Sequence, residues 1–142
     1  MRRLMLLLAA SAVAGCQSPL PPVDPQMAWV DFSVPFPNDT LLMAERLDNQ
    51  RLNDGRFFQV MPGRHVLLVR FDFQVPGGGG GGDRGMMGGP SERLCYLTIK
   101  YDHFEAGQRY LLVGQSIAFI PGARLYNAKR EIVAEDSESY CL

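Results

Sequence analysis

Three residues that could bind a metal ion lie within four positions of one another, in the segment Asp102-His103-Phe104-Glu105. Carboxylate oxygens and an imidazole nitrogen can hold a hard or borderline metal when a turn brings them together. No second histidine lies nearby in the sequence, and the turn residues Ala106-Gly107 follow directly. We therefore interpret the segment as a solvated turn between two strands and predict no metal site.

His65 is the other residue of the chain that could perform acid–base chemistry or bind a metal near neutral pH. It follows Pro62-Gly63-Arg64, and no serine, cysteine or acid accompanies it in a triad-like motif. The favoured interpretation is a half-buried turn histidine whose ring nitrogen satisfies a backbone carbonyl. We predict no catalytic residue, no cofactor and no enzymatic activity.

Met86 and Met87 stand side by side in a glycine-rich segment, and Met61 lies elsewhere in the chain. Thioethers bind Cu(I), but a copper site needs several spaced ligands, which two adjacent methionines do not supply. We interpret them as an adaptable, adhesive tip. The glycine run also lacks the Gly-Lys-Ser/Thr sequence and the following helix of a phosphate-binding loop.

The first 16 residues have the parts of a secretory signal, with Arg2 and Arg3, an apolar run over 4–14 and a final Val13-Ala14-Gly15-Cys16. The apolar run is shorter than the ~20 residues that a membrane-spanning helix needs. The last four residues resemble the lipobox of bacterial lipoproteins, although Val13 stands where that family most often has leucine. This resemblance implies a signal peptide of residues 1–15, cleavage before Cys16 and acylation of Cys16.

Residues 16–26 form the acylated cysteine and a linker with prolines at 19, 21, 22 and 25. Prolines at this density favour an extended conformation of ~3.1 Å per residue, so we expect a stalk that spaces a domain from the membrane. Gln17 follows Cys16, and among such lipoproteins a residue other than Asp there implies transfer to the outer membrane. The predicted location is the outer membrane of a bacterial cell envelope, with the domain in the periplasm.

Charge gives no indication of a nucleic-acid partner. Removal of residues 1–15 leaves 127 residues with 12 basic and 15 acidic side chains, a net charge of −3. Nucleic-acid binding needs a clustered basic face. Membrane attachment is instead expected from the acyl chains, each buried methylene contributing about 0.8 kcal/mol.

Cys95 and Cys141 remain once Cys16 is assigned to the lipid. An exported protein with two further cysteines favours a disulfide, because free thiols are uncommon outside the cytosol. Two separate thiols, with Cys95 buried in a strand, are the alternative. A bridge would also hold a C-terminus that otherwise ends in an acidic, fraying stretch.

Residues 27–142 are predicted to form one all-β domain, a small antiparallel β-sandwich. Turn residues divide this region into short segments with alternating or apolar character, which favours a sandwich over helices. The expected strands are 28–34, 40–47, 56–60, 66–73, 93–102, 109–113, 116–120, 123–126 and 131–133. We interpret Trp29, Phe57 and Phe58 as core residues and residues of the interface between the sheets.

A glycine-rich loop over 76–90 is expected between the two clearest strands. Glycine has no side chain to bury and the most backbone entropy to lose, so no packed element can form there.

The middle of the domain resembles PEGA-like β-sandwich surface domains over residues 41–113. The resemblance rests on Val60-Met61-Pro62-Gly63-Arg64-His65-Val66 and on Ala106-Gly107-Gln108-Arg109-Tyr110-Leu111. It implies a small sandwich that binds or spaces rather than one that catalyses.

These observations predict a lipid-anchored envelope protein that acts as a non-enzymatic structural or protein-interaction module, with an envelope protein as partner. The alternative is an envelope lipoprotein that binds a glycan or a peptide. A binder should show a concave aromatic patch, whereas a scaffold should show an exposed sheet edge.

Overall fold

The computed structural model describes residues 18–37, 40–76 and 91–142, and these residues form nine strands and no helix. No segment of this part of the chain is a helix long and apolar enough to cross a bilayer. The strands are β1 (Ala28–Ser33), β2 (Thr40–Leu47), β3 (Gln50–Arg51), β4 (Phe58–Val60), β5 (Gly63–Val75), β6 (Ser91–Phe104), β7 (Arg109–Ile117), β8 (Ile120–Tyr126) and β9 (Ile132–Cys141). The all-β class predicted from the sequence is confirmed.

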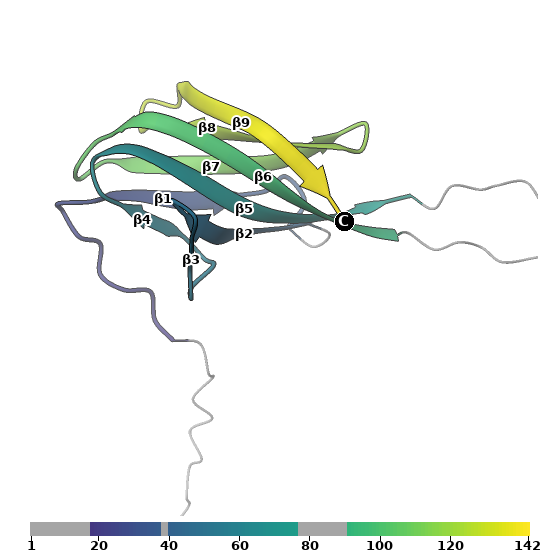
Figure 1. The fold of residues 1–142 in the computed structure, drawn as a ribbon, viewed down its shortest axis with the longest axis horizontal. Coiled ribbons are helices and arrows are strands. Elements are labelled where there is room, and N and C mark those ends of the chain that lie inside the picture. The colour runs from purple at the N-terminus through teal and green to yellow at the C-terminus, as the bar shows by residue number, and fades with distance from the viewer. Residues whose placement is uncertain (1–17, 38–39, 77–90) are drawn as a thin grey trace, which may run out of the picture.

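All nine strands belong to one sheet in the order β3-β2-β5-β6-β9-β8-β7-β1-β4, which curls into a half-barrel (Figure 1). The sequence predicted two antiparallel sheets, and the structure differs in two respects. The sheet is continuous, and β1 pairs in parallel with β7, Trp29 lying opposite Arg109 and Ser33 opposite Val113. A parallel pair needs a long crossover, which the whole of β2 to β6 supplies here.

Strand β9 makes the sheet continuous because it changes partner halfway along. Its first half pairs with β8, Arg124 lying opposite Glu135, and its second half pairs with β6, Ile99 lying opposite Asp136. Bulges accompany the change, as at the corners of sheets whose strands switch from one layer to the other. The predicted disulfide between Cys95 and Cys141 is confirmed, and it fixes the end of β9 to β6.

The core lies between the two facing halves of the curled sheet. Alternation along the long strands supplies it, since Leu67, Val69 and Phe71 of β5 are fully buried and side chains between them face outward. The predicted alternation of β5 and β6 is therefore confirmed. The opposite half contributes Leu112 and Leu125.

Several strand boundaries differ from the sequence prediction. The strand β7 continues through Gly114, where a break was expected, since Gly114 pairs with Ala123 of β8. An added Cβ at this position would lie 3.1 Å from the ring of Phe71, so the close packing there favours glycine. The strand β8 likewise continues through Pro121 and Gly122, and β9 extends to Cys141 because the disulfide and the pairing with β6 order the acidic stretch.

The stalk joins the domain at the start of β1. The N–H of Gly107 donates to the carbonyl of Met27 at 2.9 Å, so the stalk enters beside the turn between β6 and β7. Farther upstream, Nη1 of Arg56 donates to the carbonyl oxygen of Ser18 at 2.9 Å. The described part of the stalk therefore contacts the domain at two places.

Candidate interaction site

A tight turn joins β7 and β8 (Figure 1). It exposes four consecutive apolar residues, which we call the apolar tip: Ile117, Ala118, Phe119 and Ile120. Ile117 is 64%, Phe119 51% and Ile120 70% exposed. Ile117 pairs with Ile120, which leaves a two-residue loop of Ala118 and Phe119. Exposed side chains of this size lose the stabilisation of ~1.5–3 kcal/mol that burial would give each of them.

The backbone of the apolar tip is strained. Ala118 has φ 47° and Phe119 φ 66°, the left-handed pattern of a type I′ turn. This turn suits Asn-Gly or Asp-Gly, and the left-handed conformation costs other residues roughly 1–2 kcal/mol each. Strain of this kind concentrates at sites that contact other molecules.

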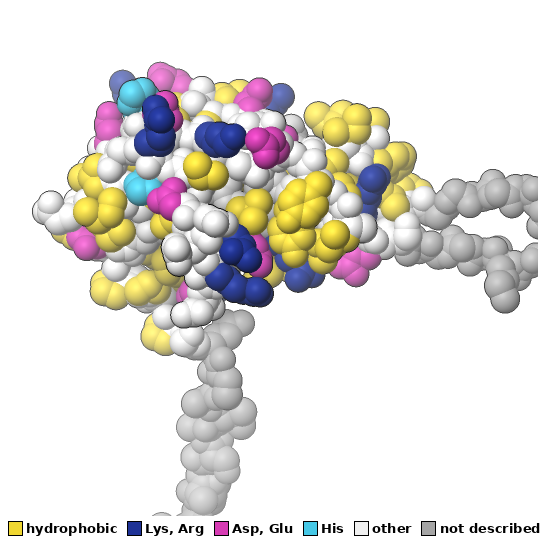
Figure 2. Space-filling view, viewed as in Figure 1, with side chains coloured by type: hydrophobic (Ala, Val, Ile, Leu, Met, Phe, Trp, Pro, Cys, Tyr) yellow, Lys and Arg dark blue, Asp and Glu magenta, His cyan; other side chains and the backbone are white. Residues whose placement is uncertain are grey.

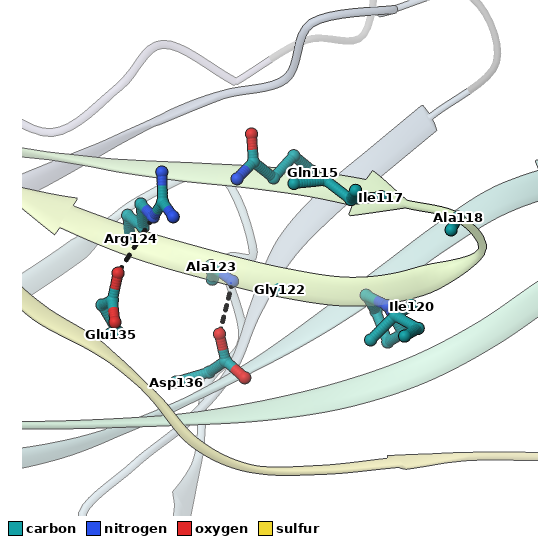
Figure 3. A pocket seen from close by; sticks show the side chains of 10 residues that line it. Gln115, Ile117, Ala118, Ile120, Gly122, Ala123, Arg124, Glu135 and Asp136 are labelled. Carbon is teal, nitrogen blue, oxygen red and sulfur yellow. Dashed lines mark hydrogen bonds and ion pairs between the residues drawn. The ribbon is translucent and has the colours of Figure 1, made fainter.

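A hollow of about 460 Å³ lies beside the apolar tip on the outer surface of the sheet (Figure 3). The hollow forms at Gly122, because glycine has no side chain to fill the space. It also lies where β9 ends its pairing with β8 and begins its pairing with β6. Ile117 and Ile120 border it on one side. On the other side Nε of Arg124 donates to Oε1 of Glu135 at 3.0 Å.

The edge of β8 along this hollow does not offer a free ladder of hydrogen bonds. Pro121 has no N–H to donate, and the N–H of Ala123 donates to Oδ1 of Asp136 at 2.7 Å (Figure 3). Proline and inward-turned acids are the devices that protect sheet edges from strand addition. The site therefore offers side-chain contacts rather than a place for an added strand.

Other exposed apolar residues lie at the same end of the domain, which we call the distal end. Phe36 is 71% exposed and shares a small groove with Ser116 and Thr40. Leu142 is 82% exposed, and its N–H donates to the carbonyl of Leu94 near the disulfide. Figure 2 shows a group of hydrophobic side chains at this end, on the right of the view.

Trp29 is buried on the outer surface of β1 rather than in the main core. Its ring stacks on Phe57 with centroids 4.2 Å apart, and Arg109 lies over it at 5.7 Å. Phe58, in contrast, belongs to the core as predicted. The hydrogen bond from Arg109 lowers the pKa of Asp31, which burial partly opposes and the indole N–H of Trp29 reinforces.

The residues that the sequence marked for chemistry do not come together. The carboxylate of Asp102 pairs with Arg64 at 3.0 Å, and His103 packs edge-on against Tyr101. Nε2 of His65 lies 2.7 Å from the carbonyl oxygen of Met61, the arrangement favoured from the sequence. Within the described ranges no three His, Cys, Asp or Glu side chains gather to hold a metal.

Two predicted sites lie outside the described residues. Cys16, the predicted acylation site, precedes them, and Met86 and Met87 fall between Pro76 and Ser91. The apolar tip is the site that sequence reasoning missed. The run of four apolar residues in 117–120 is its signal in the sequence, but such a run predicts a strand and not a turn.

Searches against protein-family models, curated proteins and solved structures find no match to the chain.

Proposed function

We propose that the chain is a lipoprotein anchored through Cys16 to the outer membrane of a bacterial envelope, with a non-enzymatic domain that binds a protein partner in the periplasm. The observation that carries the proposal is the strained, exposed apolar tip. A turn that costs stability and exposes Ile117, Phe119 and Ile120 is accounted for by a partner whose apolar groove covers them.

The placement of the tip supports this function. The parallel pairing of Trp29 with Arg109 places the stalk beside the start of β7, and the tip lies at the end of the same strand. Nine residues at ~3.3 Å each separate the two ends by about 30 Å. The tip therefore lies far from the place where the stalk contacts the domain, and a partner can bind the tip without meeting the stalk.

The two facing halves of the curled sheet serve, in this proposal, as the small sandwich that the sequence predicted. The PEGA-like resemblance over 41–113 accords with a domain that binds or spaces, and it stays a prediction. A rigid double layer suits a module that holds one contact surface at a fixed distance from its anchor.

Crosslinking in intact cells tests the partner contact. The double variant Ile117→Ser/Ile120→Ser should lose the crosslinked product while keeping its melting temperature, because both side chains are exposed. Met61→Ser/Ile132→Ser is the matched control, since these residues are 57% and 50% exposed elsewhere. Equal crosslinking of the tip variant and the wild type would refute the assignment.

Palmitate labelling tests the anchor separately. The label should appear on the wild-type chain and vanish in Cys16→Ser, since the thiol is the predicted acylation site. Labelling that persists in this variant would exclude the anchor without affecting the crosslinking result.

A second candidate function, recognition of a glycan or peptide, is favoured by the hollow at Gly122. Its volume of about 460 Å³ is within the range of ligand pockets. Its lining residues are aliphatic and charged rather than aromatic, which is less typical of a glycan site. Gly122→Val should obstruct the centre of the hollow, and the added Cβ would make an ordinary contact with Oδ1 of Asp136 at 3.4 Å. The spectral shifts caused by titration with a glycan or peptide should then disappear in this variant. If they do so while crosslinking to the protein partner is unchanged, the hollow is the functional site.

A further inference from the structure

Two arginines lie directly opposite each other on the short edge of the sheet. Arg46 of β2 and Arg51 of β3 are partners on the ladder and flank the turn at Asp48 and Asn49. Like charges placed opposite each other destabilise a strand pair. Glu45 offsets part of that cost through its ion pair with Arg51, and an anion bound by both arginines would offset more of it.

Protein contacts leave much of this arginine pair available. Nη2 of Arg51 forms a long ion pair with Oε1 of Glu45 at 3.6 Å, and the Arg51 side chain is still 73% exposed. Nη1 of Arg46 donates to the carbonyl oxygen of Asn49 at 3.2 Å. Each guanidinium carries five N–H donors in a planar fork that matches phosphate oxygens, so further donors face the solvent.

The arginine pair lies beside the stalk. Residues 51–56 run along β2, since the N–H of Ala44 donates to the carbonyl of Gly55 at 2.9 Å. Arg56, next in the chain, holds the carbonyl of Ser18, and Cys16 is two residues farther upstream. Two extended residues span at most ~7 Å. Figure 2 shows Lys and Arg side chains gathered over β3, next to the place where the stalk leaves the domain.

We propose that Arg46 and Arg51 bind the phosphate of an anionic phospholipid headgroup in the leaflet that holds the acyl chains of Cys16. This inference rests on the proposed lipid anchor. A phosphodiester carries one negative charge and offers paired oxygens to two guanidinium forks. The contact fixes the β2–β3 edge against the bilayer surface and leaves the apolar tip at the other end of the molecule.

The orientation of the anchored protein tests this site. The mature, acylated chain carrying Asn53→Cys has one free thiol, and a fluorophore there should report proximity to quenchers attached to lipid headgroups. In phosphatidylethanolamine vesicles containing phosphatidylglycerol, we expect quenching at least about threefold stronger than in Arg46→Gln/Arg51→Gln. Arg64→Gln/Arg93→Gln, with the same change in charge elsewhere, should match the wild type. Equal quenching in the arginine-pair variant and the wild type would overturn the site.

Vesicle binding without the acyl chains isolates the headgroup contact. The mature chain with Cys16→Ser should sediment with phosphatidylglycerol vesicles about tenfold better than its Arg46→Gln/Arg51→Gln derivative, and better than with phosphatidylcholine vesicles. Inorganic phosphate serves as the soluble probe. Binding of inorganic phosphate without a preference for phosphatidylglycerol would overturn the lipid assignment. A failed anchor would show in palmitate labelling alone and would leave this result intact.

Discussion

Two turns with the same backbone differ in what their side chains do. The turn at Asp48 and Asn49 has φ of 48° and 67°, and the turn at Ala118 and Phe119 has φ of 47° and 66°. The carboxylate of Asp48 ties the first turn to β5. Its Oδ1 accepts a hydrogen bond from the N–H of Val66 at 2.8 Å, and its Oδ2 lies 2.5 Å from Nδ1 of His65.

The second turn has no comparable chemistry of its own. Neither Ala118 nor Phe119 has a polar side-chain atom that could satisfy the backbone. Asp and Asn tolerate the left-handed region because their side chains bond locally, whereas Ala and Phe pay its steric cost. The first turn therefore stabilises the fold, and the second is explained by what it presents to a partner.

The largest expected effect comes from the disulfide at the distal end, which has no counterpart beside the first turn. Cys95 and Cys141 close a loop with a sequence separation of 46, which contributes on the order of 4 kcal/mol in the chain-entropy model. Cys95→Ala/Cys141→Ser should lower the melting temperature by ten degrees or more. Reducing and non-reducing mass spectra, which should differ by two hydrogens, verify the bridge. Unchanged melting would show that strand pairing alone holds β9.

Removal of the Asp48 side chain, which bonds the first turn to β5, should have the next largest effect on stability. Asp48→Ala loses the bonds to Val66 and His65 and places alanine in the left-handed region, for a loss of about 2 kcal/mol. Asp102→Ala is the control, because the Asp102 carboxylate pairs with the exposed Arg64, and loss of such a surface pair should cost under about 0.5 kcal/mol. Denaturant unfolding measures the free energy of unfolding of both variants. Equal losses in the two variants would show that the Asp48 side chain does not stabilise the first turn.

Restoration of favourable turn chemistry to the second turn should stabilise the protein. Ala118→Asn/Phe119→Gly supplies the sequence that a type I′ turn prefers, and we expect a gain of about 1 kcal/mol in the free energy of unfolding. The same variant should crosslink less to the partner, since Phe119 is removed. A loss of stability would mean that the aromatic ring contributes to folding and that the turn is not strained for contact.

Local patterns predicted the features that depend on neighbours in sequence. The alternation in Leu67, Val69 and Phe71 indicates β5, and the turn residues Asp48 and Asn49 directly follow the predicted strand 40–47. Features set by distant residues were missed. Gly114 was expected to end a strand, but it lies within one, where the ring of Phe71, more than 40 residues away in sequence, leaves little space for a larger side chain.

The candidate site was also beyond local reasoning. The run of apolar residues in 117–120 is typical of a strand, and only the pairing of Ile117 with Ile120 shows that it forms a turn. Likewise, the hollow depends on β9 changing partner at Asp136, which is a property of the whole sheet. The sandwich prediction missed this shared strand because sequence periodicity identifies strands without indicating their partners.

Acid should affect the two turns differently. Burial raises the pKa of Asp48, but hydrogen bonds from Val66 and His65 outweigh it, so the pKa is lowered in the folded state. The resulting stability is present above the unfolded pKa near 3.8 and is lost as pH falls through the lower folded value. Protection against amide exchange should therefore decrease at Gln50 below pH 4 while Ile120 is unaffected. Parallel loss of protection at both amides would contradict this.

The smallest effect is expected from the glycine-rich segment, predicted as a loop over 76–90 and mostly outside the described residues. The ladder between β5 and β6 extends to the pair of Val75 and Ser91, so the strand ends are already adjacent on either side of it. Replacement of residues 77–89 with Asn-Gly should leave the melting temperature within about two degrees of wild type, because shortening a loop changes closure entropy only slightly. Crosslinking of the shortened variant to the partner distinguishes two roles for this segment. If the crosslinked product is retained, the segment is a spacer. If the product is lost while the protein still folds, the segment with Met86 and Met87 takes part in the contact in addition to the apolar tip. A large loss of stability would contradict both interpretations, since it would require the segment to contribute to the core.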